Sequence, residues 1–190
     1  MIVGTSLKIT AEIIQEMSST VANVDSDAVE MLVDELEKAR NIFCVGAGRS
    51  GILLQAFCMR LNHLGFSAYL AGGLPCPPAS HEDLIVVVSG SGSSPSVSAI
   101  VAQGRAAHAK VVVFTAQEHE RPETIMGADR TIFIPAPAAL INQQNDSSRQ
   151  PMRTLFEQVC FLLCESIICR LISKKGLGDE EIARRHANLE

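Results

Sequence analysis

Short apolar runs alternate with longer amphipathic stretches through the middle of the chain. Five such runs are rich in Val and Ile and are bounded by turn residues: 42–45, 67–70, 84–88, 111–114 and 131–134. Continuous apolar runs of this length are typical of strands that are buried on both faces. The intervening stretches 49–64 and 95–108 repeat with helical period, and a shorter helix is expected near 121–127. The alternation predicts an α/β fold with a doubly wound, five-stranded parallel sheet.

Further helices are expected at both ends of the chain. Apolar positions recur with helical spacing in 8–22 and 26–39, and Asp25, Ser26 and Asp27 are candidate N-caps for the second of these. A strong helix over 152–174 and a short one over 179–187 follow the last strand. We expect one domain of 190 residues, made of N-terminal helices (1–39), an α/β core (40–134), a loop that acts as a lid (135–151) and C-terminal helices (152–190).

Composition and charge limit the possible partners. Apolar residues make up 47% of the chain and the formal net charge is −5, so a folded core is expected and a nucleic-acid partner is not. The N-terminus has no secretory pattern and no apolar run is long enough to cross a membrane. The six cysteines follow no metal-binding spacing, and we expect reduced thiols rather than a metal site. These features predict a cytoplasmic protein without a membrane partner.

Two loops of small residues follow the first and third predicted strands. Residues 46–51 read Gly-Ala-Gly-Arg-Ser-Gly, residues 89–94 read Ser-Gly-Ser-Gly-Ser-Ser, and each loop leads into a predicted helix. Free N–H groups at a helix N-terminus and nearby hydroxyls favour an anion such as phosphate. The predicted phosphate-binding hydroxyls are those of Ser50, Ser89, Ser91 and Ser94, and the predicted loop glycines are Gly46, Gly48, Gly90 and Gly92. Tight turns with helix caps are the alternative, which explains the glycines but less readily the four hydroxyls.

The first loop also matches the G-x-G-x-x-G fingerprint of dinucleotide-binding folds. That interpretation requires an acidic residue about 20 residues further on, where it would bind the ribose. Residues 69–73 read Tyr-Leu-Ala-Gly-Gly, and no acidic residue occurs before Glu82. The sequence therefore favours a phosphorylated small molecule over NAD.

Three longer segments, together with the two loops, carry a family resemblance. They are 59–66 (Met-Arg-Leu-Asn-His-Leu-Gly-Phe), 150–158 (Gln-Pro-Met-Arg-Thr-Leu-Phe-Glu-Gln) and 185–190 (Arg-His-Ala-Asn-Leu-Glu). In order and spacing they resemble the sugar isomerase (SIS) domain family, and within it the 6-phospho-3-hexuloisomerases. The resemblance runs from about residue 40 to the C-terminus and implies a flavodoxin-like α/β sandwich.

The resemblance implies an isomerase that converts D-arabino-3-hexulose 6-phosphate to D-fructose 6-phosphate in the ribulose monophosphate route of formaldehyde fixation. It implies a homotetramer, no metal or other cofactor, and metabolic coupling to hexulose-phosphate synthase. Moving a carbonyl from C3 to C2 through a cis-enediol requires a base, and Glu157 is our candidate. His63 and His186 are candidates to polarise the carbonyl or to transfer hydroxyl protons.

Two positions depart from the family pattern, and two other functions stay open. Ser93 and Ser94 stand where the family usually has Glu-Thr, and Arg153 stands where it usually has Gly. Arg153 could contact the phosphate or a hydroxyl, or could lie on a solvent-facing surface. The alternative functions are another SIS isomerase, acting on an arabinose or heptose phosphate, and a non-catalytic module that senses phosphosugars.

Overall fold

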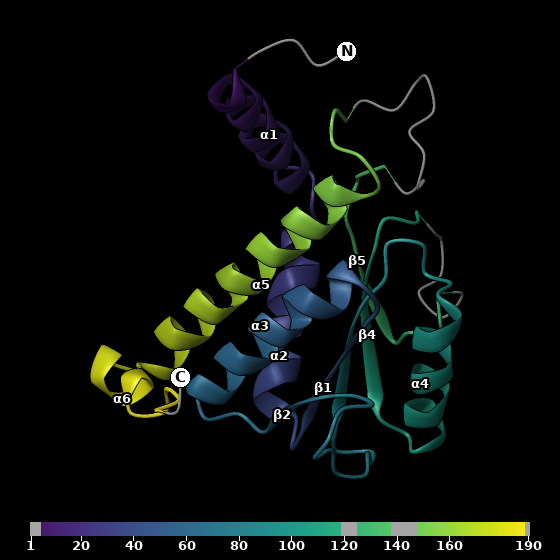
Figure 1. Cartoon of the computed structure of the whole chain (residues 1–190). Helices are drawn as coiled ribbons and strands as arrows, with labels where there is room; N and C mark the ends of the chain where they lie inside the picture. Colours follow the sequence, from purple (N-terminus) through teal and green to yellow (C-terminus); the bar gives the residue numbers. More distant parts are fainter. Residues whose placement is uncertain (1–4, 119–124, 138–147, 189–190) are drawn as a thin grey trace.

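A five-stranded, all-parallel sheet forms the centre of the molecule (Figure 1). The structure is a computed structural model, which describes residues 5–118, 125–137 and 148–188. The strands are β1 (Ile42–Gly46), β2 (Ala68–Leu70), β3 (Leu84–Val88), β4 (Lys110–Thr115) and β5 (Arg130–Phe133). Their order in space is β2-β1-β3-β4-β5, which is the flavodoxin-like order and confirms the predicted α/β class.

Helices cover both faces of the sheet. They are α1 (Ser6–Val21), α2 (Ser26–Lys38), α3 (Arg49–His63), α4 (Pro95–Ala106), α5 (Thr154–Lys175) and α6 (Asp179–Ala183). Side chains of α4 pack with one face of the strands, and side chains of α2, α3 and α5 pack with the other (Figure 1). The two apolar clusters explain why the strands read as continuous apolar runs, because neither face of the sheet meets water.

The path of the chain creates a crevice between β1 and β3. From β1 the chain crosses by α3 to β2 at one edge, and it then returns to β3 on the other side of β1. The next crossover, α4, lies on the opposite face. The loops after β1 and β3 therefore diverge to opposite faces, which leaves a crevice beyond the carboxyl ends of these two strands, where ligands bind in open α/β sheets.

Most element boundaries agree with the sequence-based prediction to within two residues. The last helix is shorter than predicted and ends at Ala183. The long C-terminal helix begins at Thr154 rather than 152, because Met152 and Arg153 adopt left-handed backbone conformations that cannot continue a helix. Residues 125–127 form a turn, and the rest of the helix predicted near 121–127 lies outside the described residues, as does 138–147 of the predicted lid. The lid therefore stays a prediction.

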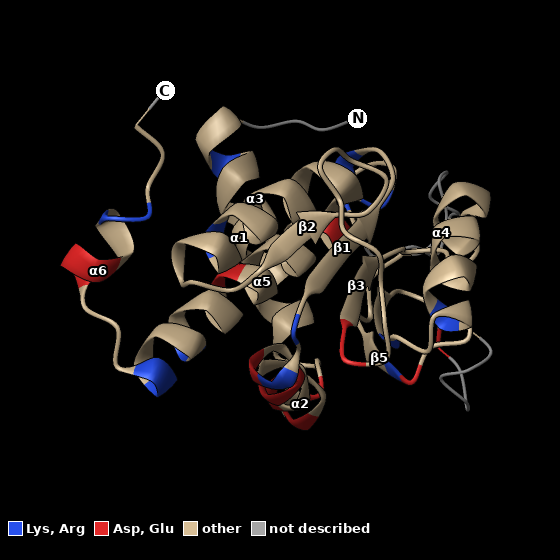
Figure 2. Cartoon of the chain, turned by 90° about the horizontal axis from the view of Figure 1, so that it is seen from below, with Lys and Arg blue, Asp and Glu red and all other residues tan. Residues whose placement is uncertain are grey.

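All six cysteines carry free thiols. Charged side chains gather on particular helices. Figure 2 shows Asp and Glu on α2 and α6, and Lys at the last turn of α5. Lys174 contacts Asp34 and Glu37, so the basic end of α5 is joined to acidic α2. Within the described residues, no helix combines the length and the apolar character that crossing a bilayer requires.

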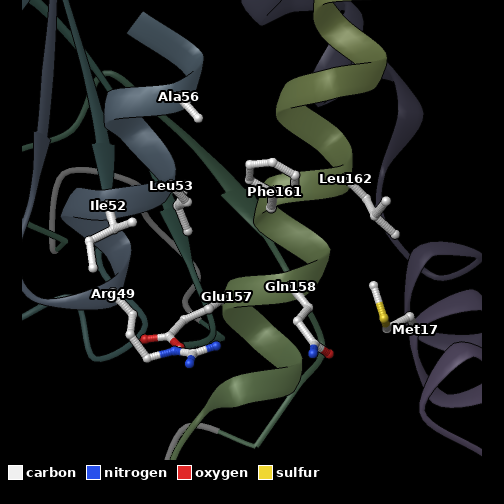
Figure 3. A pocket seen from close by; sticks show the side chains of 9 residues that line it. All are labelled: Met17, Arg49, Ile52, Leu53, Ala56, Glu157, Gln158, Phe161 and Leu162. Atoms are coloured by element: carbon white, nitrogen blue, oxygen red, sulfur yellow. The ribbon is translucent and has the colours of Figure 1, made fainter. Parts of the chain in front are cut away.

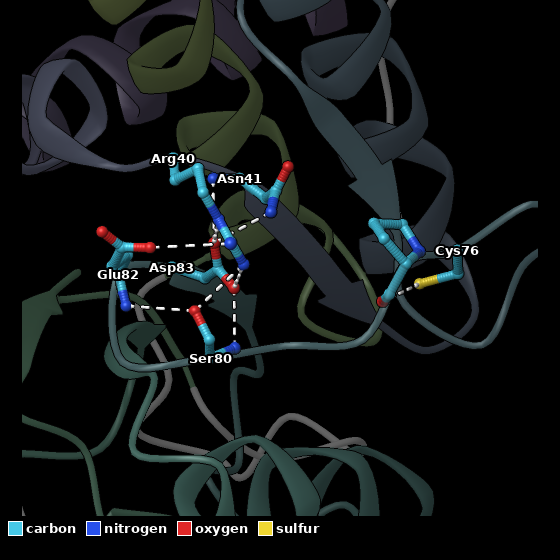
Figure 4. A network of polar contacts seen from close by, with 7 residues as sticks. Arg40, Asn41, Cys76, Ser80, Glu82 and Asp83 are labelled. Atoms are coloured by element: carbon cyan, nitrogen blue, oxygen red, sulfur yellow. Dashed lines mark hydrogen bonds and ion pairs between the residues drawn. The ribbon is translucent and has the colours of Figure 1, made fainter.

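The buried carboxylate of Asp83 joins the segments that precede β1 and β3, at the amino-terminal ends of these strands and opposite the crevice (Figure 4). The Asp83 side chain is fully buried and accepts hydrogen bonds from Arg40, from the backbone and side chain of Asn41, and from the backbone N–H of Ser80 at 2.6 Å. Burial by itself raises the pKa of Asp83, but the hydrogen bonds from Arg40, Ser80 and Asn41 outweigh it, and the pKa lies below its ordinary value of 3.8.

Replacing Asp83 by Ala should lower the free energy of unfolding at pH 7 by about 2–3 kcal/mol, because buried donors lose a charged acceptor. The pKa of the folded state lies below that of the unfolded state, so this contribution is present at neutral pH and disappears as the pH falls through the folded-state value. Urea unfolding of the wild type and of Asp83→Ala over a series from pH 7 to pH 2 measures the effect, and the difference in stability between them should shrink as the pH falls. Glu82→Ala, which removes an exposed carboxylate from the same arginine, should cost less than about 1 kcal/mol. Equal losses for the two variants would contradict this account.

Candidate active site

The two small-residue loops lie side by side at the β1/β3 crevice. The first leaves β1 at Gly46 and enters α3 at Arg49, and the second leaves β3 at Ser89 and enters α4 at Pro95. Gly46 is required by a close approach, since a Cβ there would lie 2.9 Å from the backbone of Ser50 and Gly51. Gly48 and Gly92 have positive φ values of 57° and 61°. The close approach at Gly46 places the start of α3 against the end of β1. The N–H groups at the N-terminus of α3 therefore lie at the crevice.

A cavity of about 150 Å³ lies between these loops and the start of α5. Its lining includes all four serines predicted to bind phosphate, Ser50, Ser89, Ser91 and Ser94, together with Glu157. The remaining lining residues are Ala47, Val88, Gly90, Val97, Arg153 and Phe156. The structure thus brings together the predicted phosphate-binding hydroxyls and the predicted base, which are far apart in the sequence.

The helix N-termini at the cavity carry no side-chain caps. Ser94 is the N-cap residue of α4, but its hydroxyl makes no capping hydrogen bond and lies 3.4 Å from the hydroxyl of Ser96. Gly48, the N-cap of α3, has no side chain to donate or accept. Helix N-termini without caps leave backbone N–H groups that can bind an anion. Ser94 therefore makes no capping hydrogen bond, whereas the hydroxyl of Ser91 accepts from the N–H of Ser93 within the loop, as in a tight turn.

Glu157 lies in the first turn of α5 and pairs with Arg49 at the start of α3. The Glu157 side chain is 15% exposed and the Arg49 side chain is 62% exposed. The Nε of Arg49 donates to Oε2 of Glu157. This contact spans 108 residues of sequence and orients the carboxylate at the mouth of the serine-lined cavity.

Glu157 also borders a second, larger hollow of about 420 Å³ between α3, α5 and α1 (Figure 3). Apart from Arg49, Glu157 and Gln158, its lining is apolar: Met17, Ile52, Leu53, Ala56, Phe161 and Leu162. Figure 3 shows the carboxylate of Glu157 and the guanidinium of Arg49 meeting at one end of the hollow. The carboxylate therefore lies where the polar cavity and the apolar hollow adjoin.

The two candidate histidines lie away from the serine-lined cavity. His63 is the last residue of α3 and is 5% exposed, and its ring stacks on that of His186 with 5.2 Å between the ring centroids. Ser50 lies at the other end of the same helix, so thirteen residues of helix, or about 20 Å, separate His63 from the serine-lined cavity. Within one chain the structure does not bring these histidines to Glu157.

Sequence reasoning assigned no role to Arg49, and it left the role of Arg153 open. Arg49 was part of the first glycine loop, but its partner is on α5, and nothing in the local pattern indicates that pairing. Phe156 was also missed; a Cβ on Gly90 would lie 3.2 Å from the Phe156 ring, so this glycine permits the second loop to pack against α5. Position 94 keeps its hydroxyl in the cavity, whereas Ser93 is exposed and does not line it.

Comparison with known proteins identifies the family to which this fold and these loops belong. The model of the SIS domain family matches residues 35–140, which include both small-residue loops and the β1/β3 crevice. The chain belongs to the SIS domain family. The match covers more than half of the chain and confirms the resemblance inferred from the loops.

Several relatives that match nearly the whole chain are named as isomerases. A 3-hexulose-6-phosphate isomerase of Bacillus subtilis is 36% identical, covering 95% of this chain and 96% of its own length. A 3-hexulose-6-phosphate isomerase of Mycobacterium gastri is 35% identical over 92% of this chain and 86% of its own. A Methanococcus jannaschii structure, for which a molecular function of 3-hexulose-6-phosphate isomerase was inferred, superposes with a TM-score of 0.77 at 28% identity, covering 97% of this chain and 98% of that chain.

One of the three segments that resemble the family has a structural role in this SIS domain. Asn62 donates to the carbonyl oxygen of Ala68 at 2.9 Å and accepts from its N–H at 3.3 Å. The same side chain donates to the carbonyl of Cys58 in the preceding turn. Asn62 thereby joins the end of α3 to edge strand β2 and stabilises this edge of the sheet.

Proposed function

We propose that this protein is a 3-hexulose-6-phosphate isomerase, which converts D-arabino-3-hexulose 6-phosphate to D-fructose 6-phosphate. The observation that carries the proposal is that one cavity, at two helix N-termini, is lined both by the four serines and by the carboxylate of Glu157. The named relatives, similar over nearly the whole chain, support the choice of substrate.

The phosphate of the substrate occupies the serine-lined cavity in this proposal. Hydroxyls of Ser50, Ser89, Ser91 and Ser94 and the N–H groups that begin α3 and α4 hold the phosphate oxygens. The carbon chain then extends from C6 toward Glu157. In the 3-ketose, attack of O1 or O5 on C3 would close only a four-membered ring, so the substrate is open-chain and the forward reaction needs no ring-opening step.

Glu157 acts as the base in the proposed chemistry. The carboxylate removes the proton from C2, and the C3 carbonyl becomes part of a cis-enediol. The proton returns to C3 while the hydroxyl proton moves from O2 to O3, which leaves the carbonyl at C2. Arg49, paired with Glu157, orients the carboxylate and supplies a positive charge near the developing oxyanion. In this scheme the hydroxyl proton passes directly between the adjacent oxygens O2 and O3 of the cis-enediol, and neither a metal nor a nucleotide takes part.

A coupled assay tests the proposal directly. Purified protein, hexulose-phosphate synthase, ribulose 5-phosphate and formaldehyde should together produce D-fructose 6-phosphate, and omission of the protein should abolish product. Parallel assays with arabinose 5-phosphate and sedoheptulose 7-phosphate test the other SIS isomerases. Binding of fructose 6-phosphate without turnover of any of these substrates would reject the isomerase and favour the sensing module.

The homotetramer belongs to the same proposal. The lining of the larger hollow includes exposed apolar side chains, with Ile52 65%, Phe161 40% and Leu162 44% exposed, and α1 adds Ile14 at 60%. Apolar surface of this kind is usually covered by a partner, and a second copy of the chain would cover it in an oligomer. His63 and His186 can take part in catalysis only if a neighbouring subunit brings them to a cavity.

Light scattering at micromolar concentration should give a mass several times that of the 20.4 kDa chain, and four times that mass if the tetramer is correct. The substitution Phe161→Glu should lower the measured mass, because a carboxylate would be buried at the interface. Lys38→Glu, an exposed change of charge on α2, is the control and should leave the mass unchanged. A monomeric wild-type protein would reject the oligomer. A cytoplasmic location and metabolic coupling to the synthase complete the proposal.

A further inference from the structure

Arg153 occupies an unusual place at the serine-lined cavity. It is the N-cap residue of α5, one turn before Glu157, and it lines the cavity together with Ser89 and Ser91. A Cβ built on Gly90 would lie 3.4 Å from Cδ of Arg153, so the arginine stem runs along the backbone of the second serine loop. The position of the stem therefore carries the guanidinium end of the side chain along the loop that is proposed to hold the phosphate.

The charge of the cavity lining depends on this side chain. Among the described residues that line it, Arg153 carries a positive and Glu157 a negative formal charge. The serine hydroxyls and backbone N–H groups are neutral donors. A sugar phosphate at pH 7 carries between one and two negative charges, which in protein sites are commonly met by an arginine that binds two oxygens at once.

The backbone at this position is strained. Arg153 has φ 65° and ψ 15°, and the preceding Met152 has φ 55°. For residues other than Gly, Asn and Asp the left-handed conformation is unfavourable, and such residues gather at functional sites, where the surrounding structure holds them. A glycine at 153 would adopt this conformation without strain, so the backbone of the arginine carries a conformational cost that a glycine would not.

We propose that Arg153 is a specificity-determining residue whose guanidinium binds the phosphate of the substrate beside the second serine loop. The proposal rests on the phosphosugar function proposed above, and it adds the residue that supplies a positive charge to the substrate phosphate. Arg153 then selects the phosphorylated sugar over the free sugar, while Glu157 performs the proton transfer.

Calorimetric titration of the intact protein with D-fructose 6-phosphate tests the proposal. Arg153→Gln should weaken binding about 10- to 100-fold, as expected for losing a charged hydrogen-bonding partner, and Arg153→Lys should lose less. The dependence of the dissociation constant on salt concentration should also become shallower in the Gln variant. Arg60→Gln makes the same change of charge at an exposed position near the far end of α3 and should bind normally.

A stability measurement separates binding from a purely structural role. Arg153→Gly should raise Tm by about 2–4 °C, because it relieves the left-handed strain, while it weakens phosphosugar binding as much as Arg153→Gln. A fall in Tm together with unchanged affinity would show that Arg153 only supports the start of α5, and would overturn the inference. So would equal affinities of wild type, Arg153→Gln and Arg60→Gln for fructose 6-phosphate.

The coupled assay distinguishes this result from failure of the proposed function. If wild-type protein binds fructose 6-phosphate through Arg153 but converts none of the phosphosugars tested, the inference about Arg153 stands and the isomerase is rejected. If wild type is an active isomerase and Arg153→Gln keeps the wild-type KM, the isomerase stands and the inference about Arg153 is rejected.

Discussion

Replacing Glu157 by Gln should lower kcat for 3-hexulose 6-phosphate by about 10²–10⁴-fold, the range typical of losing a general base. Glutamine keeps the shape of the side chain and can still accept from Arg49, but an amide cannot take the C2 proton. Because the serine loops that are proposed to hold the phosphate are unchanged, KM should change much less than kcat. Initial rates in the coupled assay across a range of substrate concentrations measure both constants.

Glu165→Gln is the matched control for this variant. It makes the same change on the same helix, about two turns further on and outside the lining of either hollow. It should keep wild-type kcat, and calorimetry should show that Glu157→Gln still binds fructose 6-phosphate. Near-normal kcat for Glu157→Gln would contradict the assignment of the base and would make His63 or His186 of a neighbouring subunit the leading candidate.

Replacing Ser89 and Ser91 together by Ala should raise KM at least about 100-fold, because each hydrogen bond to a charged phosphate contributes about 1.5–3 kcal/mol. The change should fall mainly on KM, since the reacting carbons lie away from the phosphate. Ser89 is 5% exposed, so this variant is first checked by circular dichroism and thermal unfolding. Steady-state kinetics on the folded variant then gives KM and kcat separately.

The matched control is the double change of Ser93 and Ser98 to Ala. Ser93 is exposed in the same loop, Ser98 lies in the following helix α4, and neither lines the cavity. Their removal should leave KM within about twofold of wild type, as expected for side chains without a ligand. An unchanged KM for Ser89→Ala/Ser91→Ala, or an equal rise for the control, would contradict the phosphate site.

The Asp83 network shows a kind of contact that the local pattern of the sequence did not predict. The apolar runs predict β1 and β3 separately, but they do not say that Asp83 before β3 binds Arg40 and Asn41 before β1. The carboxylate becomes buried only because the two strands pair, and its lowered pKa follows from the donors that this pairing brings together. A polar residue in a loop has many possible partners, and the fold selects among them.

The sequence likewise predicted some features of the candidate site and not others. The sequence predicted the serines that line the cavity because the loop pattern is local: strand, small residues, helix. It predicted Glu157 through a segment that resembles a family, not through its surroundings. It did not predict the pairing of Glu157 with Arg49, or the separation of Glu157 from the histidines within one chain.

The sequence by itself determined the order and type of the elements, because period and turn chemistry are properties of neighbouring residues. It also determined that two helix N-termini rich in hydroxyls would follow two buried strands. Only the tertiary structure decided which residues share the site, since the packing of α5 against α3 brings Arg153 and Glu157 to the serine loops and Glu157 to Arg49. Contacts over such distances in the sequence depend on how whole elements pack, and local periodicity carries no information about them.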